Sequence, residues 1–235
     1  MKIGVFDSGI GGLTVLTKLI EKYPNCEYIY YGDTANAPFG NKTIDEFKII
    51  AENIINFLIE QKVDIIVIAC GTISSNLKEY LVSKYDIPIF DIISGTINYI
   101  NSSNYESIGI LCTEATKNSG IFNNIKKDVQ VLSCPPLATL IENSDSNIDN
   151  YIKEITSNLN NKDLIVLGCI HYPLIIDTIK KYAKSDILDM SDYINININE
   201  ESNFKLELYF SNITDLLLDN VSRILKNYKH VIKNK

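Results

Sequence analysis

The stretch DIIVIAC at residues 64–70 recurs as DLIVLGC at residues 163–169. Each copy is a short apolar run that begins at an aspartate and ends at a cysteine. Two further pairs keep the same order: IGVFDS (3–8) matches IGILCT (108–113), and IPIFD (87–91) matches ILD (187–189). Because the members of each pair lie about a hundred residues apart, the period is too long for a solenoid and predicts a duplicated domain.

Helical patterns separate these apolar runs. Apolar residues have helical spacing at Leu13, Leu16, Leu19 and Ile20, at Ile50, Ile54, Phe57 and Leu58, and at Leu77 and Leu81. Thr43 with Glu46 three residues later predicts a capping box, and Pro173 predicts a helix start directly after Cys169. The alternation of Asn and Ile at 194–199 fits either an edge strand or a loose connection.

Short apolar strands that alternate with helices predict parallel α/β sheets. We therefore expect two pseudo-symmetric α/β domains with the active site at their interface. The first would comprise residues 1–93 together with 189–235, and the second would comprise residues 94–188.

Charge, apolar content and cysteine content argue against several kinds of partner and compartment. The chain has 235 residues and a net charge of −7, which argues against a nucleic-acid or anionic-membrane surface. Its one arginine, Arg223, argues against an arginine clamp for a substrate carboxylate, so backbone N–H groups are the expected alternative. No apolar run reaches the ~20 residues of a membrane span, and the residues at the N-terminus are not expected to act as a signal peptide. The 5 cysteines, an odd number without close pairs, suggest a reducing cytoplasm.

Cys70 and Cys169 end equivalent strands, and each leads into a predicted helix. Such a position lies where open α/β sheets bind ligands, and a helix N-terminus lowers a thiol pKa from ~8.5 towards neutrality. In a duplicated fold, the two thiols would face each other across one interface. Two opposed groups can remove a proton from one face of a carbon and deliver one to the other, as racemisation at an amino-acid α-carbon requires. This chemistry needs no cofactor and no metal, and Cys26, Cys112 and Cys134 are expected to be buried apolar residues.

Four motifs in order resemble the glutamate racemases of bacterial cell-wall synthesis. They are FDSGIGGLTVL (6–16), GDTANAPFG (32–40), AC-x-T (69–72) and GC-x-HYPL (168–174). The similarity continues through TEAT (113–116), PPLATLIE (135–142) and the closing helix, so it covers nearly the whole chain. The resemblance implies a cofactor-independent racemase that interconverts L- and D-glutamate for peptidoglycan synthesis. It also implies two domains that close over a small cavity, and usually a homodimer.

By that resemblance, Cys70 and Cys169 are the two acid–base groups, which Asp7 and His171 assist and orient, and Glu142 is a further polar member of the site. The substrate pocket would be lined by Asp7, Ser8, Phe39, Gly40, Gly71, Thr72, Ile170 and His171.

His171 also has a physical rationale, because it lies two residues after Cys169. In an extended segment both side chains would point the same way, so the imidazole could act on the thiol. The alternative is a core or solvated histidine. Asp7 could instead be a turn residue, and Asp33 either contacts the substrate amino group or merely starts a loop.

Three pocket positions depart from the family pattern. The family has asparagine after the first cysteine, threonine after the second and a proline-tyrosine-glycine loop, where this chain has Gly71, Ile170 and Phe39. Each change removes a side-chain hydrogen-bonding group, and a hydrogen bond to a charged group is worth roughly 1.5–3 kcal/mol. The pocket therefore uses backbone groups and water instead, or prefers a substrate less polar than glutamate, or belongs to an impaired paralogue.

Four other interpretations remain open. The SGIGG loop (8–12) with Asp33 suggests a dinucleotide site, but Thr14 stands where the fingerprint needs its third glycine. A thiol hydrolase would use Cys169 or Cys70 as nucleophile and His171 as base. The same three residues could bind zinc, although close cysteine pairs are absent. A binding protein on a racemase scaffold would hold its ligand without turnover.

Overall fold

Two parallel β-sheets form the frame of the molecule. The computed structural model describes residues 1–37, 39, 42–196 and 202–235. Within these residues, sheet A has the strand order β10-β9-β2-β1-β3-β4 and sheet B the order β6-β5-β7-β8. Sheet A comprises β1 (Lys2–Asp7), β2 (Glu27–Gly32), β3 (Ile65–Ile68), β4 (Ile89–Asp91), β9 (Lys205–Phe210) and β10 (Val231–Asn234). Sheet B comprises β5 (Ser107–Cys112), β6 (Asp128–Ser133), β7 (Leu164–Leu167) and β8 (Asp186–Asp189).

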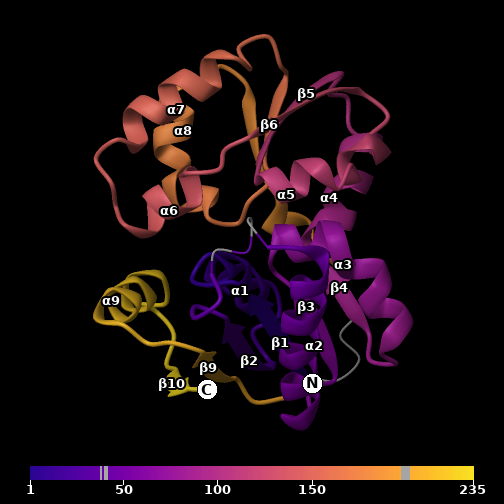
Figure 1. Ribbon diagram of the computed structural model, residues 1–235, viewed down its shortest axis with the longest axis vertical. Coiled ribbons are helices and arrows are strands. Elements are labelled where there is room, and N and C mark those ends of the chain that lie inside the picture. Colours follow the sequence, from indigo (N-terminus) through magenta and orange to yellow (C-terminus); the bar gives the residue numbers. More distant parts are fainter. Residues whose placement is uncertain (38, 40–41, 197–201) are drawn as a thin grey trace.

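The two sheets repeat one topology. The order β2-β1-β3-β4 in sheet A corresponds to β6-β5-β7-β8 in sheet B, and these neighbours pair in parallel. The three repeated sequence pairs lie at β1 and β5, at β3 and β7, and at β4 and β8. The predicted fold class is therefore confirmed. Sheet A also contains β9 and β10, so the C-terminal segment lies beside the N-terminal strands (Figure 1).

Helices connect the strands of each sheet. Those of the N-terminal half are α1 (Gly12–Lys22), α2 (Ile44–Glu60), α3 (Gly71–Lys84) and α4 (Ile92–Ser102). The second sheet is accompanied by α5 (Glu114–Asn118), α6 (Leu137–Glu142), α7 (Ile148–Ser157), α8 (Ile176–Tyr182) and the 3-10 turns η2 (Ile121–Asn124), η3 (Tyr172–Ile175) and η4 (Met190–Tyr193). The helix α9 (Asp215–Ile224) connects β9 and β10.

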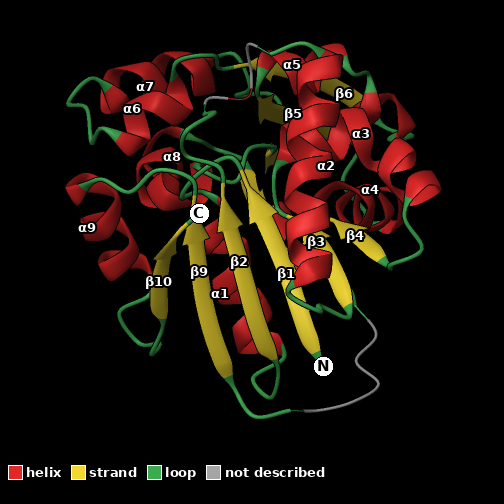
Figure 2. Ribbon diagram, turned by 60° about the horizontal axis from the view of Figure 1, so that its bottom comes forward, coloured by secondary structure: helices red, strands yellow, loops and turns green. Residues whose placement is uncertain are grey.

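Alternate residues of the central strands face opposite sides of sheet A. Ile3 and Val5 of β1 join the apolar cluster that contains α1, whereas Phe6 joins the cluster of α2 and α3. Figure 2 shows α2 in front of the sheet and α1 behind it. Because helices cover both faces, β3 is apolar at every position, which explains why its sequence shows no alternation.

Local sequence signals are only partly matched by the structure. Thr43 and Glu46 form the predicted capping box at the start of α2. Pro173 lies in the first turn of η3, and the α-helix begins only at Ile176, so the prediction of an α-helix starting at Pro173 was wrong by one 3-10 turn. Residues 194–196 are not a strand, and the rest of the Asn-Ile alternation lies outside the described residues.

Each sheet with its helices forms one lobe. The chain enters the second lobe through α4 and leaves it through η4, and these two elements contact each other. The proposed division at residues 93/94 and 188/189 falls in the first turn of α4 and at the end of β8. Figure 2 shows the strands of sheet A with their carboxyl ends directed towards the second lobe.

Candidate active site

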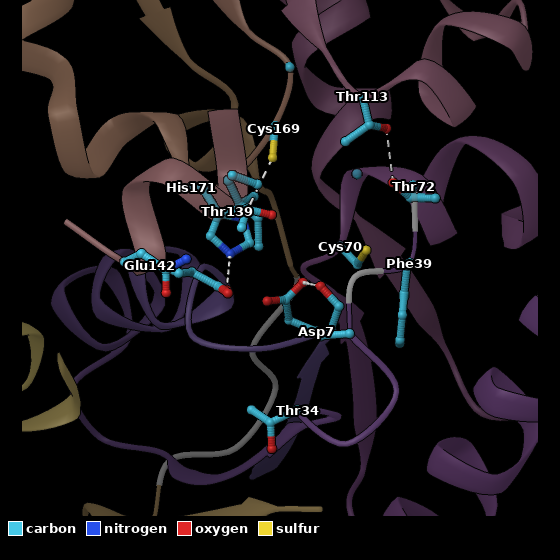
Figure 3. A pocket seen from close by; sticks show the side chains of 17 residues that line it. Asp7, Thr34, Phe39, Cys70, Thr72, Thr113, Thr139, Glu142, Cys169 and His171 are labelled. Atoms are coloured by element: carbon cyan, nitrogen blue, oxygen red, sulfur yellow. Dashed lines mark hydrogen bonds and ion pairs between the residues drawn. The ribbon is translucent and has the colours of Figure 1, made fainter. Parts of the chain in front are cut away.

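A cavity of about 250 Å³ lies beyond the carboxyl ends of both sheets. Figure 3 shows the side chains around it. It is lined by Asp7, Ser8, Thr34, Ala37, Phe39, Cys70, Gly71, Thr72, Thr113, Ala138, Thr139, Glu142, Asn143, Gly168, Cys169, Ile170 and His171. The structure thus brings together all the residues proposed for the site from sequence, apart from Gly40, which lies outside the described residues. Their chemical roles stay predictions.

The first thiol lies where β3 meets α3. The helix begins at Gly71, so Cys70 is its N-terminal cap residue. Burial raises the pKa of the Cys70 thiol, the negative charge of Asp7 adds to this effect, and backbone N–H groups of Ile73 and Thr72 oppose it more weakly. The expectation of a lowered thiol pKa is therefore wrong for Cys70. The helix N-terminus does act on the sulfur, but desolvation outweighs it.

The second thiol belongs to a relay with a histidine and a glutamate. Cys169 Sγ lies 3.6 Å from His171 Nδ1, and His171 Nε2 lies 2.8 Å from Glu142 Oε1. Burial alone would lower the pKa of His171, but its contacts with Cys169 and Glu142 prevail and hold that pKa well above its usual range. An imidazolium beside Cys169 can donate Nδ1–H to a thiolate.

The proximity of Cys169 and His171 has a different cause from the predicted one. The segment is not extended: His171 has helical backbone angles, and Tyr172 N–H donates to the Cys169 carbonyl at 3.0 Å. A tight turn therefore brings the two side chains together. The prediction of contact is matched, and its reason, an extended backbone, was wrong.

Asp7 is fully buried at the end of β1 and lines the cavity. One carboxylate oxygen accepts hydrogen bonds from Gly9 N–H at 3.0 Å and Gly12 N–H at 2.9 Å. Ser8 Oγ lies 3.4 Å from the other oxygen. Asp7 thus organises the turn before α1 and also presents a carboxylate to the cavity, so the structural and the catalytic interpretation are compatible.

Two threonines bridge the lobes at the cavity wall. Thr72 Oγ1 of α3 lies 3.0 Å from Thr113 Oγ1 at the end of β5 (Figure 3). Thr113 was not singled out from sequence, although the internal repeat pairs it with Ser8 and could have identified it.

Phe39, Gly71 and Ile170, the three departures from the family pattern, all line the cavity. The Phe39 and Ile170 side chains are buried in apolar clusters. At Gly71, an added Cβ would lie 3.1 Å from the carbonyl oxygen of Gly168, so the missing side chain permits a close approach of the two lobes.

Six other cavity residues were missed by the sequence analysis: Thr34, Ala37, Ala138, Thr139, Asn143 and Gly168. Thr139 lies one helical turn before Glu142 in α6, which is a usable signal. Thr34 and Ala37 belong to the loop after β2, and no pattern in the sequence indicates that this loop runs towards the cavity.

The other three cysteines and Asp33, which were not proposed as site residues, have structural surroundings that explain their burial. Cys26, Cys112 and Cys134 are buried and do not line the cavity. Asp33 accepts hydrogen bonds from Asn36 and Ser211, which explains its burial without a substrate.

Two further properties concern the described part of the chain. No three His, Cys, Asp or Glu side chains in it are grouped as metal ligands, so the geometry gives the zinc interpretation no support. None of its helices is both long and apolar enough to cross a bilayer.

Comparison with known proteins assigns the family. A profile of the Asp/Glu/Hydantoin racemase family matches residues 14–193. A glutamate racemase of Hydrogenobaculum sp. is 38% identical, over 91% of this chain and 89% of that protein. The structure resembles glutamate racemase from Francisella tularensis in complex with D-glutamate, with a TM-score of 0.85, 28% identity and coverage of 100% and 97% of the two chains. It also resembles glutamate racemase from Aquifex pyrophilus, with a TM-score of 0.82, 30% identity and coverage of 99% of this chain and 98% of that chain. This chain therefore belongs to the Asp/Glu/Hydantoin racemase family of isomerases.

Proposed function

We propose that the protein is a cofactor-independent glutamate racemase in which Cys70 and Cys169 exchange protons with opposite faces of the substrate α-carbon. The observation that carries the proposal is that the two sulfurs line one cavity from equivalent points of two repeated lobes. In Figure 3 both side chains are directed into the same space. The solved relative with bound D-glutamate supports glutamate as the substrate.

The chemical step follows from this arrangement. A thiolate on one side takes the α-proton and becomes a thiol, and the electron pair of the broken C–H bond stays on the α-carbon. The thiol on the other side then gives its proton to the opposite face, which regenerates a thiolate. Neighbouring N–H groups at the start of α3 can stabilise negative charge that develops during this step.

The neighbours of the two thiols differ. Cys169 lies beside His171, whose imidazolium form, held by Glu142, can donate Nδ1–H to a thiolate. Cys70 is buried near the carboxylate of Asp7 and accepts backbone hydrogen bonds. We propose that His171 and Glu142 serve Cys169, and that Asp7 serves Cys70. A two-base racemase needs one thiol and one thiolate at the start of each reaction direction, and the different neighbours of Cys70 and Cys169 are the proposed basis for that difference.

Substrate recognition would rely on hydroxyl and backbone groups. Ser8, Thr72, Thr113 and Thr139 present hydroxyl groups to the cavity, and Arg223 does not line it. These hydroxyls are candidates to replace the hydrogen bonds that the departures at 39, 71 and 170 remove. A preference for a less polar amino acid is the alternative.

A thiol hydrolase is the second candidate. The line Cys169–His171–Glu142 has the order of nucleophile, base and orienting carboxylate. In that case Cys70 would have no role in chemistry, although it lines the same cavity.

The decisive experiment is incubation with L- and D-glutamate and L- and D-aspartate in deuterium oxide, followed by proton NMR. A racemase loses the α-proton signal as deuterium enters and yields both enantiomers. A hydrolase transfers acyl groups without this exchange, and a binding protein shows ligand contacts without exchange.

Cys70→Ser and Cys169→Ser should each nearly abolish racemisation. Cys134→Ser is the matched control, because Cys134 is equally buried in the second lobe but lies outside the cavity. Full activity in either cavity variant would contradict the two-base mechanism.

The biological setting is part of the proposal. The resemblance to cell-wall racemases supports a supply of D-glutamate for peptidoglycan, in the cytoplasm, by a homodimer. Light scattering after gel filtration tests the dimer, and restoration of growth to a D-glutamate-requiring bacterium tests the supply.

A further inference from the structure

The first turn of α1 lies directly against the loop that carries Cys169 and His171. Thr14 Oγ1 lies 2.8 Å from the carbonyl oxygen of Gly11 and 3.1 Å from the carbonyl oxygen of Ile170. At Gly11, an added Cβ would lie 2.7 Å from His171 Nδ1 and 2.7 Å from His171 Cε1, so only glycine permits this contact. A turn of the first lobe therefore supports the catalytic loop of the second.

The Ile170 carbonyl needs this support because of the sequence that follows it. The tight turn is held by Tyr172 N–H donating to Cys169 O at 3.0 Å and by Leu174 N–H donating to His171 O at 3.1 Å. The intermediate bond, from residue 173 to Ile170 O, cannot form because residue 173 is proline and has no N–H. Ile170 is buried, and a buried carbonyl without a partner is unfavourable.

We propose that Thr14 and Gly11 are positioning residues for the proposed racemase reaction. The Thr14 hydroxyl donates to the Ile170 carbonyl, to which Pro173 has no N–H to donate. The absence of a side chain at Gly11 leaves room for the His171 ring beside Cys169. Neither residue lines the cavity, so both act through the loop and not on the substrate. This inference rests on the proposed function.

The same turn also holds the first lobe's side of the site. Gly12 N–H, at the start of α1, donates to Asp7 at 2.9 Å, and Asp7 lies near Cys70. The turn between Asp7 and Thr14 is thus bonded to the neighbours of both thiols. It therefore couples the position of His171 to that of Asp7.

The test compares Thr14→Val, which deletes the hydroxyl and keeps the side-chain shape, with Thr14→Ser, which retains the hydroxyl. Thr17→Val is the matched control. Thr17 Oγ1 lies 2.7 Å from Thr14 O in the same helix and makes no hydrogen bond to the second lobe among the residues that the structure describes. We expect Thr14→Val to lower kcat about tenfold with KM within about twofold, because one hydrogen bond that orients the loop is lost. Thr14→Ser should restore kcat, and Thr17→Val should leave it unchanged.

A rescue variant separates positioning from general damage. In Thr14→Val/Pro173→Ala, residue 173 regains an N–H that can donate to Ile170 O, so kcat should recover most of its loss. If Thr14→Val does not fold, recovery of folding in the double variant supports the same bond. A folded double variant as inactive as Thr14→Val would overturn the proposal.

A second readout does not depend on turnover. The chain has 2 histidines, so a His230→Gln variant leaves the His171 ring as its remaining histidine signal in proton NMR. We expect Thr14→Val to move the pKa of His171 down towards its usual value, because contacts with Cys169 and Glu142 hold it up. An unmoved pKa together with unchanged kcat refutes the inference. Inactivity of the unmodified protein would refute the proposed function, and the NMR titration would still decide the role of Thr14.

Discussion

Replacement of Ile170 by threonine restores the hydroxyl that the family pattern has beside the second thiol. Ile170 is 3% exposed, packs in an apolar cluster and also lines the cavity. If a threonine hydroxyl there donates to a substrate carboxylate, the gain is that of a hydrogen bond to a charged group, about 1.5–3 kcal/mol. KM for glutamate should therefore fall about ten- to a hundredfold, with kcat within a few-fold.

Ile170→Val is the control, because valine and threonine have nearly the same shape and differ in the hydroxyl. Both variants remove a buried methyl-sized group, which costs about 0.5–1.5 kcal/mol. In a chain of this size 1 kcal/mol corresponds to about 2–4 °C in Tm, so Ile170→Val should melt roughly 1–6 °C below the unmodified protein. Ile170→Thr also buries a hydroxyl group, so without substrate it should melt lower than Ile170→Val. The comparison of threonine with valine then isolates the hydrogen bond from the loss of packing.

The assay is racemisation of D-glutamate at several concentrations, with the L-enantiomer quantified by chiral chromatography. The hydroxyl hypothesis requires the threonine variant to have a much lower KM than the valine variant. Equal KM values in the two variants would refute it and would indicate that the apolar side chain at 170 suits the natural substrate. A higher KM in both, relative to the unmodified protein, would point to a substrate less polar than glutamate.

Three further changes test other parts of the structure. Glu142→Gln should lower the pKa of His171 towards its usual value, because the carboxylate at 2.8 Å favours the imidazolium; an NMR titration of the ring with an unmoved midpoint contradicts this. Gly71→Ala should lower kcat, because its Cβ meets the Gly168 carbonyl at 3.1 Å; steady-state kinetics equal to those of the unmodified protein would refute the close approach. Hydrogen bonds from Lys205 and Lys233 lower the pKa of Glu207 to about 2, so its contribution to stability is present above its unfolded pKa and lost as pH falls through about 2. Glu207→Gln should therefore destabilise the protein in urea at pH 6 and have a smaller effect near pH 2; an equal effect at both values would disprove the charge explanation.

The frame of the molecule could be predicted because its signals are local and duplicated. Buried parallel strands appear in a sequence as short apolar runs, and the same runs occur twice in the same order. The positions of Cys70 and Cys169 follow from the frame, since each residue lies two positions after the end of a central strand. Residues without a repeated counterpart, such as Thr34 and Asn143, gave no comparable signal, and they reach the cavity through loop and helix ends that only the folded chain defines.

The pKa shifts of the site residues were harder to predict than which residues line the cavity. A helix N-terminus after Cys70 suggested an easily ionised thiol, but the pKa also depends on how much of the sulfur the other lobe and its own strand remove from water. Burial is a property of the closed fold and not of the motif. The same limit applies to His171, whose contact with Cys169 comes from a turn that the Ile170-His171-Tyr172-Pro173 sequence adopts instead of an extended strand.

The three departures from the family pattern affect residues proposed for substrate recognition and none of those proposed for proton transfer. Phe39, Gly71 and Ile170 lie beside the groups proposed to move protons, yet both thiols, Asp7 and the His171–Glu142 pair are present. The thiols follow central strands whose backbone is fixed by two neighbours each, whereas the departures lie at the first residue of α3, in the turn after β7 and between β2 and α2. A change in a recognition side chain alters one hydrogen bond, but displacement of a thiol would require rearrangement of a sheet. The geometry of proton transfer is therefore more tightly constrained than the choice of amino acid, and a shift in substrate preference requires fewer changes than a loss of racemase chemistry.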